Sequence, residues 1–481
     1  MTSIIDVDAI KDNLTAIKGG EKFSDEILRQ FNDFINDASD DELFRISPLR
    51  YAEKYNVSHL TATNLFLTAT RAGIFEFSWG TLCPSCGVFV VSEIGLRYLG
   101  TKYFCALCTL PYEADTDTAV EIAFTISPGY RRIRFHNPKE INMQEDWMHM
   151  MFSTSIALFP EVHQLLHASF QKGFEIKPGE KKVIKLELEP NHYVFIVPAS
   201  HSTAHIAVNE EHVGHFVDLE LMEDGRILPV MTHLAPGSAE IIIENHSTKS
   251  RMIGLHKDPR MAPTAVEDRV YPISSVYNTT PYLTGKQLIT NQTFHNLFPK
   301  ESIPADEGLE FNNITFLFTD LKGSTALYDR IGDAKAYKLI LQHFDILRDT
   351  IAENNGAVVK TMGDAIMACF ASPSDAALAA CGMKTKLRTL KESENLELKI
   401  GIHNGPTMAI NTNEQLDFFG QTVNIASRVQ NAAGPSEIVI TSAVYNSPGV
   451  QDTIEKACFE IVKEQEIFKG VSDKITIYRL M

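Results

Sequence analysis

A short apolar run that ends in a carboxylate constrains the last third of this chain most strongly. Residues 314–318 read Ile-Thr-Phe-Leu-Phe and are followed closely by Asp320. β-branched and aromatic residues in an unbroken run predict a buried strand. Gly323 and Ser324 predict a close turn into a helix that starts near Thr325. Asp320 is therefore expected at a strand end, where it could face a phosphate group and a hard cation.

A second carboxylate occupies a similar setting. Two short apolar runs within residues 358–368 flank a turn at Gly363 and Asp364, which is typical of a hairpin with a charged tip. Magnesium prefers oxygen ligands, and two aspartates on neighbouring strand ends suit a two-metal site. Either aspartate taken alone is also ordinary turn chemistry.

A third segment carries an amide and a guanidinium on one helix face. Asn424 and Arg428 are four residues apart in a segment with helical character, so their side chains lie one turn apart. This pair fits a ribose and a phosphate, respectively. His403 follows a predicted strand near Leu398 and is expected to pack or hydrogen-bond rather than to act as a base.

Together, these three segments resemble the class III nucleotide cyclases, and the resemblance covers residues 309–481. It implies two Mg²⁺ or Mn²⁺ ions at the site, and it assigns a role to each matching residue. The metals would be held by Asp320, Asp364 and the backbone carbonyl of Leu321, adenine by Lys360 and Asp417, the ribose by Asn424, the reacting phosphates by Arg428, and the terminal phosphates by Lys469.

The implied reaction is an adenylate cyclase reaction, in which the ribose 3′-hydroxyl of ATP attacks the α-phosphate and releases pyrophosphate. A Lys donor and an Asp acceptor match the edge of adenine. A guanylate cyclase remains the alternative enzyme, and a non-catalytic nucleotide-sensing regulator is the alternative outside enzymes. The resemblance also implies a homodimer, with Asp320 and Asp364 from one subunit and the other side chains from its partner.

At 481 residues the chain is too long for one core, so several domains are expected. The expected fold is multidomain, and its last part is an α+β, ferredoxin-like cyclase domain. The predicted divisions are a helical, winged-helix-like segment at 1–78, a zinc ribbon at 79–118, a β-sandwich at 119–256, a linker at 257–308 and the catalytic domain at 309–481.

Four cysteines form two CxxC pairs, which predict a structural Zn²⁺ site. The four are Cys83, Cys86, Cys105 and Cys108. The alternatives are two redox disulfides or a thiol switch that releases zinc on oxidation. Cys369, Cys381 and Cys458 have apolar neighbours and are expected to be small core residues.

The segment before the cysteines predicts two helices joined by a short turn, which resembles a helix-turn-helix. Its second helix, within residues 60–72, is apolar or hydroxylated, whereas a DNA-reading helix carries basic and amide side chains. A packing role is therefore favoured. The net charge of −17 also argues against a general nucleic-acid binder.

Residues 182–188, 193–197 and 239–244 alternate with period two and predict strands of the sandwich. This region holds many histidines, which are expected to be hydrogen-bonded or solvated rather than metal-bound. They are His149, His163, His167, His201, His205, His212 and His215.

No stretch reaches the roughly 18 consecutive apolar residues of a membrane-spanning helix, and residues 1–6 lack a basic segment leading into an apolar core. A cytoplasmic protein without membrane contact is expected. Its first half is expected to respond to an unknown regulatory ligand or protein.

Overall fold

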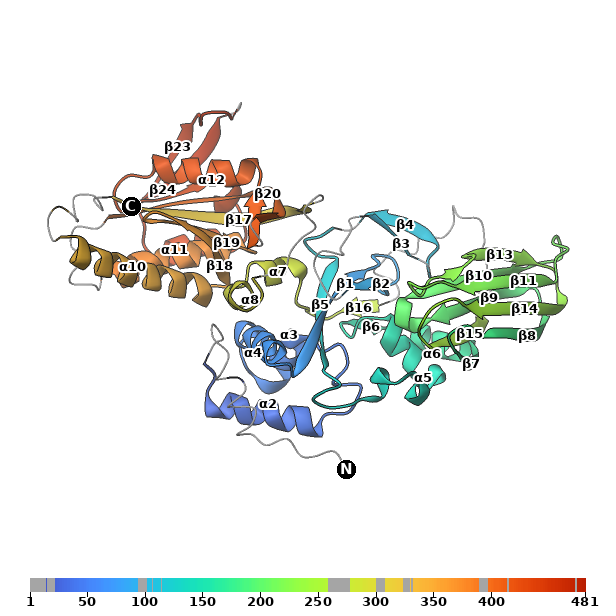
Figure 1. The fold of residues 1–481 in the computed structure, drawn as a ribbon. Helices are drawn as coiled ribbons and strands as arrows, with labels where there is room; N and C mark the ends of the chain where they lie inside the picture. The colour runs from blue at the N-terminus through green and yellow to red at the C-terminus, as the bar shows by residue number, and fades with distance from the viewer. Residues whose placement is uncertain are drawn as a thin grey trace.

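The computed structural model describes residues 14, 22–93, 102–105, 107–113, 115–257, 277–299, 308–322, 329, 332–388, 397–412, 415–471 and 474–481. The predicted catalytic segment, residues 308–481, lies at one end of an elongated molecule, and a two-sheet region at residues 170–257 lies at the other (Figure 1). A helical segment at residues 25–71 and a small sheet lie between them. The turn expected at Gly323 to Thr325 lies outside the described residues.

The first described elements are three helices packed on a small sheet. The helices are α2 (Asp25–Asp37), α3 (Pro48–Tyr55) and α4 (His59–Arg71), and the sheet has the order β2 (Phe89–Glu93), β1 (Phe75–Leu82), β5 (Val120–Ile126).

The two helices expected after residue 48 are α3 and α4, separated by Asn56, Val57 and Ser58. Ser58 caps α4 by accepting a hydrogen bond from the Thr61 amide, 3.0 Å away. All residues from Ala62 to Ala69 are buried, because α4 lies inside the core rather than on a surface. The packing role predicted for this helix is confirmed.

Strand β1 crosses the expected division at residues 78/79, and β5, expected in the sandwich, pairs with β1 from Phe75↔Ile126 to Thr81↔Val120. Phe77 and Phe124 both belong to the core around α4. This small sheet therefore joins residues from three of the expected divisions. The reason is that the apolar sides of β1 and β5 are both covered by α4.

Between β2 and β5 lies the cysteine hairpin, β3 (Lys102–Cys105) paired with β4 (Leu110–Glu113). Beyond β5 come two short 3₁₀ turns, η2 (Arg134–His136) and η3 (Pro138–Glu140), and then two helices with a short strand. These are α5 (Met143–Met151), β6 (Ile156–Leu158) and α6 (Pro160–Ser169).

Two sheets then face each other across one core. The first has the order β13 (Met231–Leu234), β10 (Ser202–Val208), β9 (Asn191–Val197), β15 (Arg251–Lys257), β7 (Phe170–Ile176), and the 3₁₀ turn η4 (Pro198–Ser200) joins β9 to β10. The second has the order β12 (Ile227–Leu228), β11 (Phe216–Leu221), β14 (Gly237–Asn245), β8 (Lys181–Leu188). The three period-two segments predicted from the sequence lie in β8, β9 and β14.

Residues 277–299, expected to be part of a linker, form packed structure instead. They contain β16 (Tyr277–Thr279), which pairs with β6, and the helices α7 (Gly285–Ile289) and α8 (Gln292–Leu297). Thr284 and Gln287 cap α7 reciprocally. Leu288, Ile289 and Phe294 are buried, so this segment has its own apolar contribution to the core.

The catalytic segment is an α+β unit around one sheet. Its strands and helices are β17 (Leu309–Lys322), α10 (Asp333–Glu353), β18 (Gly356–Met362), β19 (Ala365–Phe370), α11 (Pro373–Arg388), β20 (Glu397–Thr412), β21 (Gln415–Phe419), α12 (Gln421–Ala432), β22 (Ile438–Thr441), α13 (Ser442–Tyr445), α14 (Val450–Lys456), β23 (Ile461–Glu466) and β24 (Ile475–Leu480).

The order of that sheet is β18-β19-β17-β20-β22-β24-β23, and β21 pairs with the far end of β20. Alternate residues of β17 face opposite sides, as a strand requires. Leu317 and Leu321 pack with α10 and α11, whereas Phe316 and Phe318 pack in a core that includes α12. The helical segment expected around Asn424 and Arg428 corresponds to α12.

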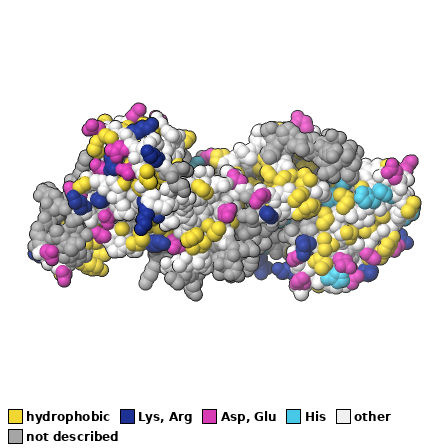
Figure 2. Space-filling view, turned by 90° about the horizontal axis from the view of Figure 1, so that it is seen from above, with side chains coloured by type: hydrophobic (Ala, Val, Ile, Leu, Met, Phe, Trp, Pro, Cys, Tyr) yellow, Lys and Arg dark blue, Asp and Glu magenta, His cyan; other side chains and the backbone are white. Residues whose placement is uncertain are grey.

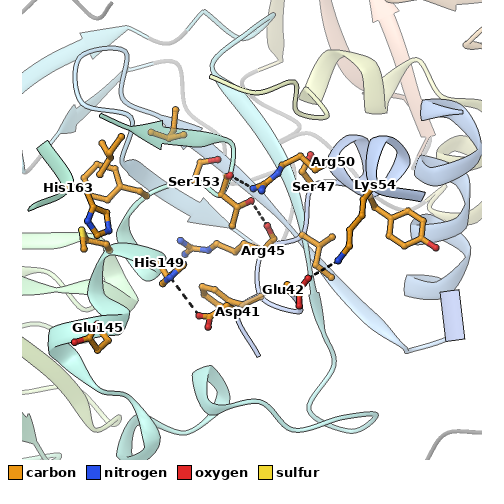
Figure 3. Close-up of a pocket in the computed structure, with 18 of the residues that line it drawn as sticks. Asp41, Glu42, Arg45, Ser47, Arg50, Lys54, Glu145, His149, Ser153 and His163 are labelled. Carbon is orange, nitrogen blue, oxygen red and sulfur yellow. Dashed lines mark hydrogen bonds and ion pairs between the residues drawn. The ribbon is translucent and has the colours of Figure 1, made fainter. Parts of the chain in front are cut away.

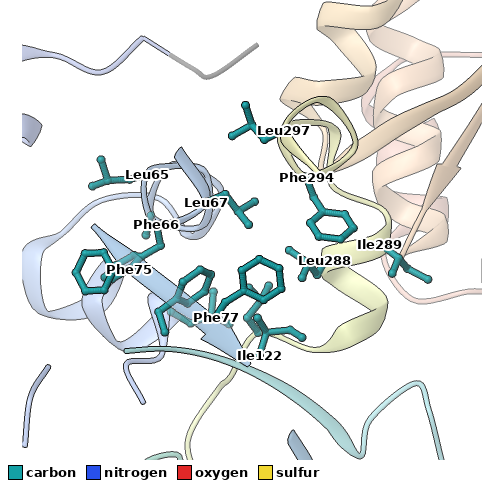
Figure 4. Packing of buried hydrophobic residues seen from close by; sticks show 14 of the residues in the cluster. Leu65, Phe66, Leu67, Phe75, Phe77, Ile122, Leu288, Ile289, Phe294 and Leu297 are labelled. Carbon is teal, nitrogen blue, oxygen red and sulfur yellow. The ribbon is translucent and has the colours of Figure 1, made fainter. Parts of the chain in front are cut away.

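One apolar core runs from the helical segment into the catalytic sheet. It contains Leu67 of α4, Phe77 of β1, Phe294 of α8 and Phe316 of β17. Figure 4 shows α7 and α8 between the first helices and the catalytic part, with Leu288, Phe294 and Leu297 turned toward Leu67 and Phe77. Because burial of shared apolar surface is favourable, the two parts stabilise one another.

Candidate active site

The two aspartates expected to bind metal lie at the same end of the sheet. Asp320 is near the end of β17, and Asp364 is in the two-residue turn between β18 and β19, after Gly363 at φ +65°. The Thr319 hydroxyl accepts a hydrogen bond of 3.1 Å from the Ile366 amide. This buried contact holds the end of β17 against the start of β19.

Both aspartates are half-buried. Among the described residues, neither carboxylate has a hydrogen bond or an ion pair. Two neighbouring, uncompensated carboxylates are suited to divalent cations.

Lys360 and Asp417 are joined by a bidentate ion pair. The Lys360 Nζ lies 2.9 Å from Asp417 Oδ1 and 2.7 Å from Oδ2. Lys360 is on β18, where the pairing with β19 shifts between Val358 and Lys360, and Asp417 is on β21. The Phe418 amide donates to Asp417 Oδ1 at 2.8 Å. Two side chains that the sequence analysis assigned to the adenine base, 57 positions apart in the chain, thus contact each other.

Asn424 and Arg428 both lie on α12. Asn424 is exposed and Arg428 is half-buried. The helix lies very close to β20 at Gly401, where a Cβ atom would be 2.1 Å from the backbone nitrogen of Gln430. Only glycine permits this approach, so Gly401 positions the helix that carries Asn424 and Arg428.

Lys469 is exposed in a turn after β23. Its neighbour Gly470, at φ +76°, lies beside Arg428, since a Cβ on Gly470 would be 3.5 Å from Arg428 Nη2. The structure therefore brings the turn that carries Lys469 next to the guanidinium of Arg428.

His403 has the structural role that the sequence predicted. Its Nδ1 lies 2.9 Å from the Thr441 hydroxyl, and burial lowers its pKa to about 4. Two other contributors escaped the sequence analysis: Thr319, through its bond to Ile366, and Gln292 of α8, whose Oε1 accepts a hydrogen bond of 2.8 Å from the Val358 amide. No local sequence motif marks either residue, because each acts through a contact with a residue far away in the chain.

The four cysteines of the two CxxC pairs come together. All four Sγ atoms lie within 4.8 Å of one another, with 3.9 Å from Cys83 to Cys108 and 3.7 Å from Cys86 to Cys105. Four sulfur atoms at 2.3 Å from a tetrahedral zinc ion would be about 3.8 Å apart. The Cys108 amide also points to Cys105 Sγ at 3.5 Å. The donor set and spacing fit a zinc ion.

The remaining cysteines differ from one another in burial. Cys369 is buried and Cys381 is half-buried, as expected of residues near the core, whereas Cys458 is exposed because it follows the end of α14 at φ +56°. The expectation of a core position was therefore wrong for Cys458.

Several histidines of the two-sheet region are hydrogen-bonded. His205 lies 2.7 Å from His192 and 3.0 Å from the Thr203 hydroxyl, and His201 lies 3.1 Å from the Met150 carbonyl. Histidine side chains are seen at this end of the molecule from above, where acidic and basic side chains are interspersed (Figure 2).

No helix in the described part of the chain has the length and apolar content that a membrane crossing requires.

Comparison with known families divides the chain into two parts. Residues 10–296 match the family described as "Family of unknown function (DUF5939)". Residues 308–481 match the family described as "Adenylate and Guanylate cyclase catalytic domain". The adenylate cyclase of Lachancea kluyveri is 29% identical over 188 residues, covering 34% of this chain and 10% of that protein. Guanylate cyclase 2G of Mus musculus is 26% identical over 178 residues, covering 34% and 15%.

Among solved structures, the adenylyl cyclase CyaB from P. aeruginosa is 21% identical, with a TM-score of 0.32; the match covers 36% of this chain and 96% of that one. The chain spans between a tenth and a fifth of the length of the first curated relatives it matches. The chain belongs to the family of unknown function DUF5939, which here precedes a class III adenylate and guanylate cyclase catalytic domain.

Proposed function

We propose that this protein is an adenylate cyclase that converts ATP to 3′,5′-cyclic AMP and pyrophosphate. The observation that carries the proposal is the bidentate pair of Lys360 and Asp417, together with Asp320 near a strand end and Asp364 in a neighbouring turn, which have no partner among the described residues. The first pair offers one donor and one acceptor for a base, and the second offers oxygen ligands for cations.

Asp320, Asp364 and the carbonyl of Leu321 are the proposed ligands of two Mg²⁺ or Mn²⁺ ions. The fit rests on the two half-buried carboxylates, which have no cationic partner among the described residues. When bound, the two ions would lower the pKa of the ribose hydroxyl and offset the charge of the triphosphate.

Base choice follows from hydrogen-bond chemistry. Adenine presents an acceptor ring nitrogen and an amine donor, which match the Lys360 ammonium and the Asp417 carboxylate. These two groups satisfy each other when no base is present, and their side chains are 42% and 18% exposed. Because both adenylate and guanylate cyclases occur among the relatives, GTP is the alternative substrate.

The residues of α12 are proposed to orient the ribose and phosphates. Asn424 would bond to the ribose, and Arg428 would stabilise the charge that grows on the α-phosphate, a role suited to a permanently charged, planar group. The turn that carries Lys469 adjoins Arg428, so a lysine at that position would extend the cationic surface toward the terminal phosphates.

A homodimer is proposed because the class III cyclases, which this segment resembles, build each site from two subunits. Lys360 lies within β18 and pairs with Asp417, whereas Asp364 lies in the turn after that strand. Met362 lies between Lys360 and Asp364 in the sequence, and Phe419 lies two residues after Asp417; their exposed fractions are 42% and 68%. Exposed apolar side chains next to an incomplete site favour coverage by a second copy of the chain.

The part before the catalytic domain is proposed to be regulatory, and the CxxC cluster to be a structural zinc ribbon. Support for regulation comes from the shared core and from α8, which contacts the strand that carries Lys360. A regulator that binds nucleotide without catalysis remains the alternative.

The test uses the purified full-length protein with Mg²⁺ or Mn²⁺ and either ATP or GTP, with chromatographic separation of the products. Cyclic AMP from ATP is expected, and it should be abolished in Asp364→Ala because a metal ligand is lost. Dominance of cyclic GMP would contradict the assignment of Lys360 and Asp417. Nucleotide binding without either product would favour the non-catalytic regulator.

A further inference from the structure

A cavity of about 560 Å³ lies between the helical segment and the α5–β6–α6 region. Its walls come from α2, the loop before α3, α3 itself, α5 and the residues around β6 and α6 (Figure 3). The volume lies in the range of small-molecule sites, and the lining is largely apolar, with Phe44, Phe152 and Leu158 among its residues.

The carboxylates of this cavity already have cationic or histidine partners. Glu42 pairs with Lys54 at 2.8 Å, and this contact lowers the pKa of Glu42 to about 2. Asp41 pairs with Arg134, which lies outside the cavity lining, and Glu145 lies 3.5 Å from His167. The acidic side chains are therefore not available to neutralise the other cations of the lining.

Two arginines of the lining have no carboxylate partner among the described residues. Arg45 is only 8% exposed, and its guanidinium contacts the Met150 carbonyl at 2.6 Å and His201 at 2.9 Å. Burial and the nearby Arg45 lower the pKa of His201 to about 3, so His201 is a neutral partner. Arg50 donates to the Thr154 carbonyl. Arg50 itself is exposed, so its guanidinium is accessible to a solute. Arg45 is a buried cation without a carboxylate partner, which is unfavourable.

Glu121 is the carboxylate that interacts electrostatically with both Arg45 and Arg50. Its hydrogen bonds, however, are made with two serines. Its carboxylate is fully buried and accepts hydrogen bonds from Ser153 and, at 3.1 Å, from Ser155. Burial raises its pKa to about 7, although Arg45 and Arg50 act in the opposite direction. Glu121 thus carries only part of a negative charge near neutral pH.

The start of α3 supplies an independent observation. Ser47 is the N-cap residue of α3, yet its hydroxyl caps no amide. The hydroxyl is buried and has no hydrogen-bond partner among the residues that the structure describes. Ser47 as a whole is 2% exposed and lines the cavity. The positive end of the helix dipole and an unsatisfied buried hydroxyl thus occur beside Arg50. An unsatisfied buried polar group is rare in folded proteins.

We propose that this cavity binds a small amphipathic organic anion. A carboxylate or phosphate head would be held by Arg50, the Ser47 hydroxyl and the start of α3, with the charge of Arg45 behind them. The apolar body would lie against Phe44, Phe152 and Leu158. A bound anion would give the Ser47 hydroxyl its missing hydrogen-bond acceptor and would give the buried Arg45 a counter-charge.

The cavity is connected to the catalytic domain through packed elements. Helix α3 packs on α4, α4 packs on α8, and α8 packs on β18, the strand of Lys360. At the second of these contacts, Asn291 Nδ2 donates to Asn64 Oδ1 at 2.9 Å. An effect of the anion on cyclase activity rests on the proposed function; binding of the anion does not.

The experiment is calorimetric titration of the full-length protein with octanoate, with phenyl phosphate and with the neutral octanamide. We expect one-to-one binding of at least one anion and at least tenfold weaker binding of octanamide. Arg50→Met should weaken anion binding about tenfold, since a charge-assisted hydrogen bond is lost. Arg29→Met, at an exposed position on α2 outside the cavity, should bind like the unmodified protein.

Ser47→Ala separates a ligand role from a structural one. Because the hydroxyl has no partner among the described residues, the substitution should not lower the melting temperature, while it weakens anion binding several-fold. The proposal is overturned if neither anion binds at millimolar concentration, if octanamide binds as tightly as octanoate, or if Arg50→Met binds like the unmodified protein. Cyclase activity measured with and without the bound anion then tests regulation separately.

Discussion

At the residue scale, the Lys360–Asp417 pair links sequence to function most directly. A flexible ammonium and a carboxylate from different strands meet in a bidentate contact. Because the lysine side chain is 42% exposed, solvent screens the pair and its contribution to stability is small. Under the proposed function, the pair serves base recognition rather than folding.

Lys360→Ala should therefore lower activity much more than stability. We expect kcat/KM for ATP to fall at least tenfold, because a hydrogen bond from a charged donor contributes about 1.5–3 kcal/mol, with little change in Tm. The matched control is Lys386→Ala, which removes the exposed ion pair with Glu353 on α11 and α10. Equal kinetic losses in both variants would contradict base recognition by Lys360.

Glu121 is a second residue whose environment predicts a measurable effect. Burial raises its pKa from 4.5 to about 7, so the folded protein holds this proton between these pH values while the unfolded chain releases it. Stability from this group is present below pH 4.5 and is lost as the pH rises to 7, by about 3 kcal/mol in total.

Glu121→Gln removes that titration. Denaturant unfolding at pH 5 and pH 8 should show that the variant gains stability relative to the unmodified protein at the higher pH. Glu76→Gln, at an exposed position of β1, should show no such difference. A pH-independent difference between Glu121→Gln and the unmodified protein would argue against the raised pKa.

At the scale of elements, α8 is more than a connection. Its Gln292 satisfies the Val358 amide at the point where the register of β18 shifts, two residues before Lys360. A buried or half-buried amide without a partner is unfavourable, so this contact stabilises the irregular strand in the position that presents Lys360.

Gln292→Ala should lower stability by about 1 kcal/mol and reduce kcat/KM for ATP, because the strand loses a defined register. Gln292→Glu keeps an acceptor oxygen at the same place, so it should retain more of the stability and more of kcat/KM than Gln292→Ala. The comparison of KM and kcat across the two variants, together with denaturant unfolding, measures this effect. Normal kinetics in Gln292→Ala would show that the contact does not position Lys360.

At the scale of the whole molecule, the cysteine cluster and the shared core decide how the parts hold together. Cys83 and Cys105 belong to the same core as Trp147 and Phe152, so the proposed zinc ribbon packs against α5 rather than standing alone. Metal binding that needs a folded site also stabilises that site.

Loss of the cluster should therefore destabilise the protein. We expect about one equivalent of zinc by elemental analysis, and a lower Tm after removal of the metal by a chelator. Cys108→Ser should lose most of the zinc, whereas Cys381→Ser, at a half-buried position outside the cluster, should keep it. Full zinc content in Cys108→Ser would contradict the assignment.

The sequence by itself determined the local features of this protein. Strand β17, the hairpin turn at Asp364, helix α12 and the two CxxC pairs were all predictable, because hydrophobic periodicity, turn chemistry and ligand spacing act over a few residues. The candidate residues Asp320, Asn424 and Arg428 were found for the same reason, whereas Lys360 and Asp417 were assigned only through the resemblance to class III cyclases.

Only the tertiary structure decided how these features meet. The pairing of β5 with β1, the packing of residues 277–299, the contact of Gln292 with Val358 and the cavity beside Ser47 each join positions far apart in the chain. No local pattern encodes them, since they result from apolar surfaces that seek a common core and from polar groups that must find partners after that core has formed.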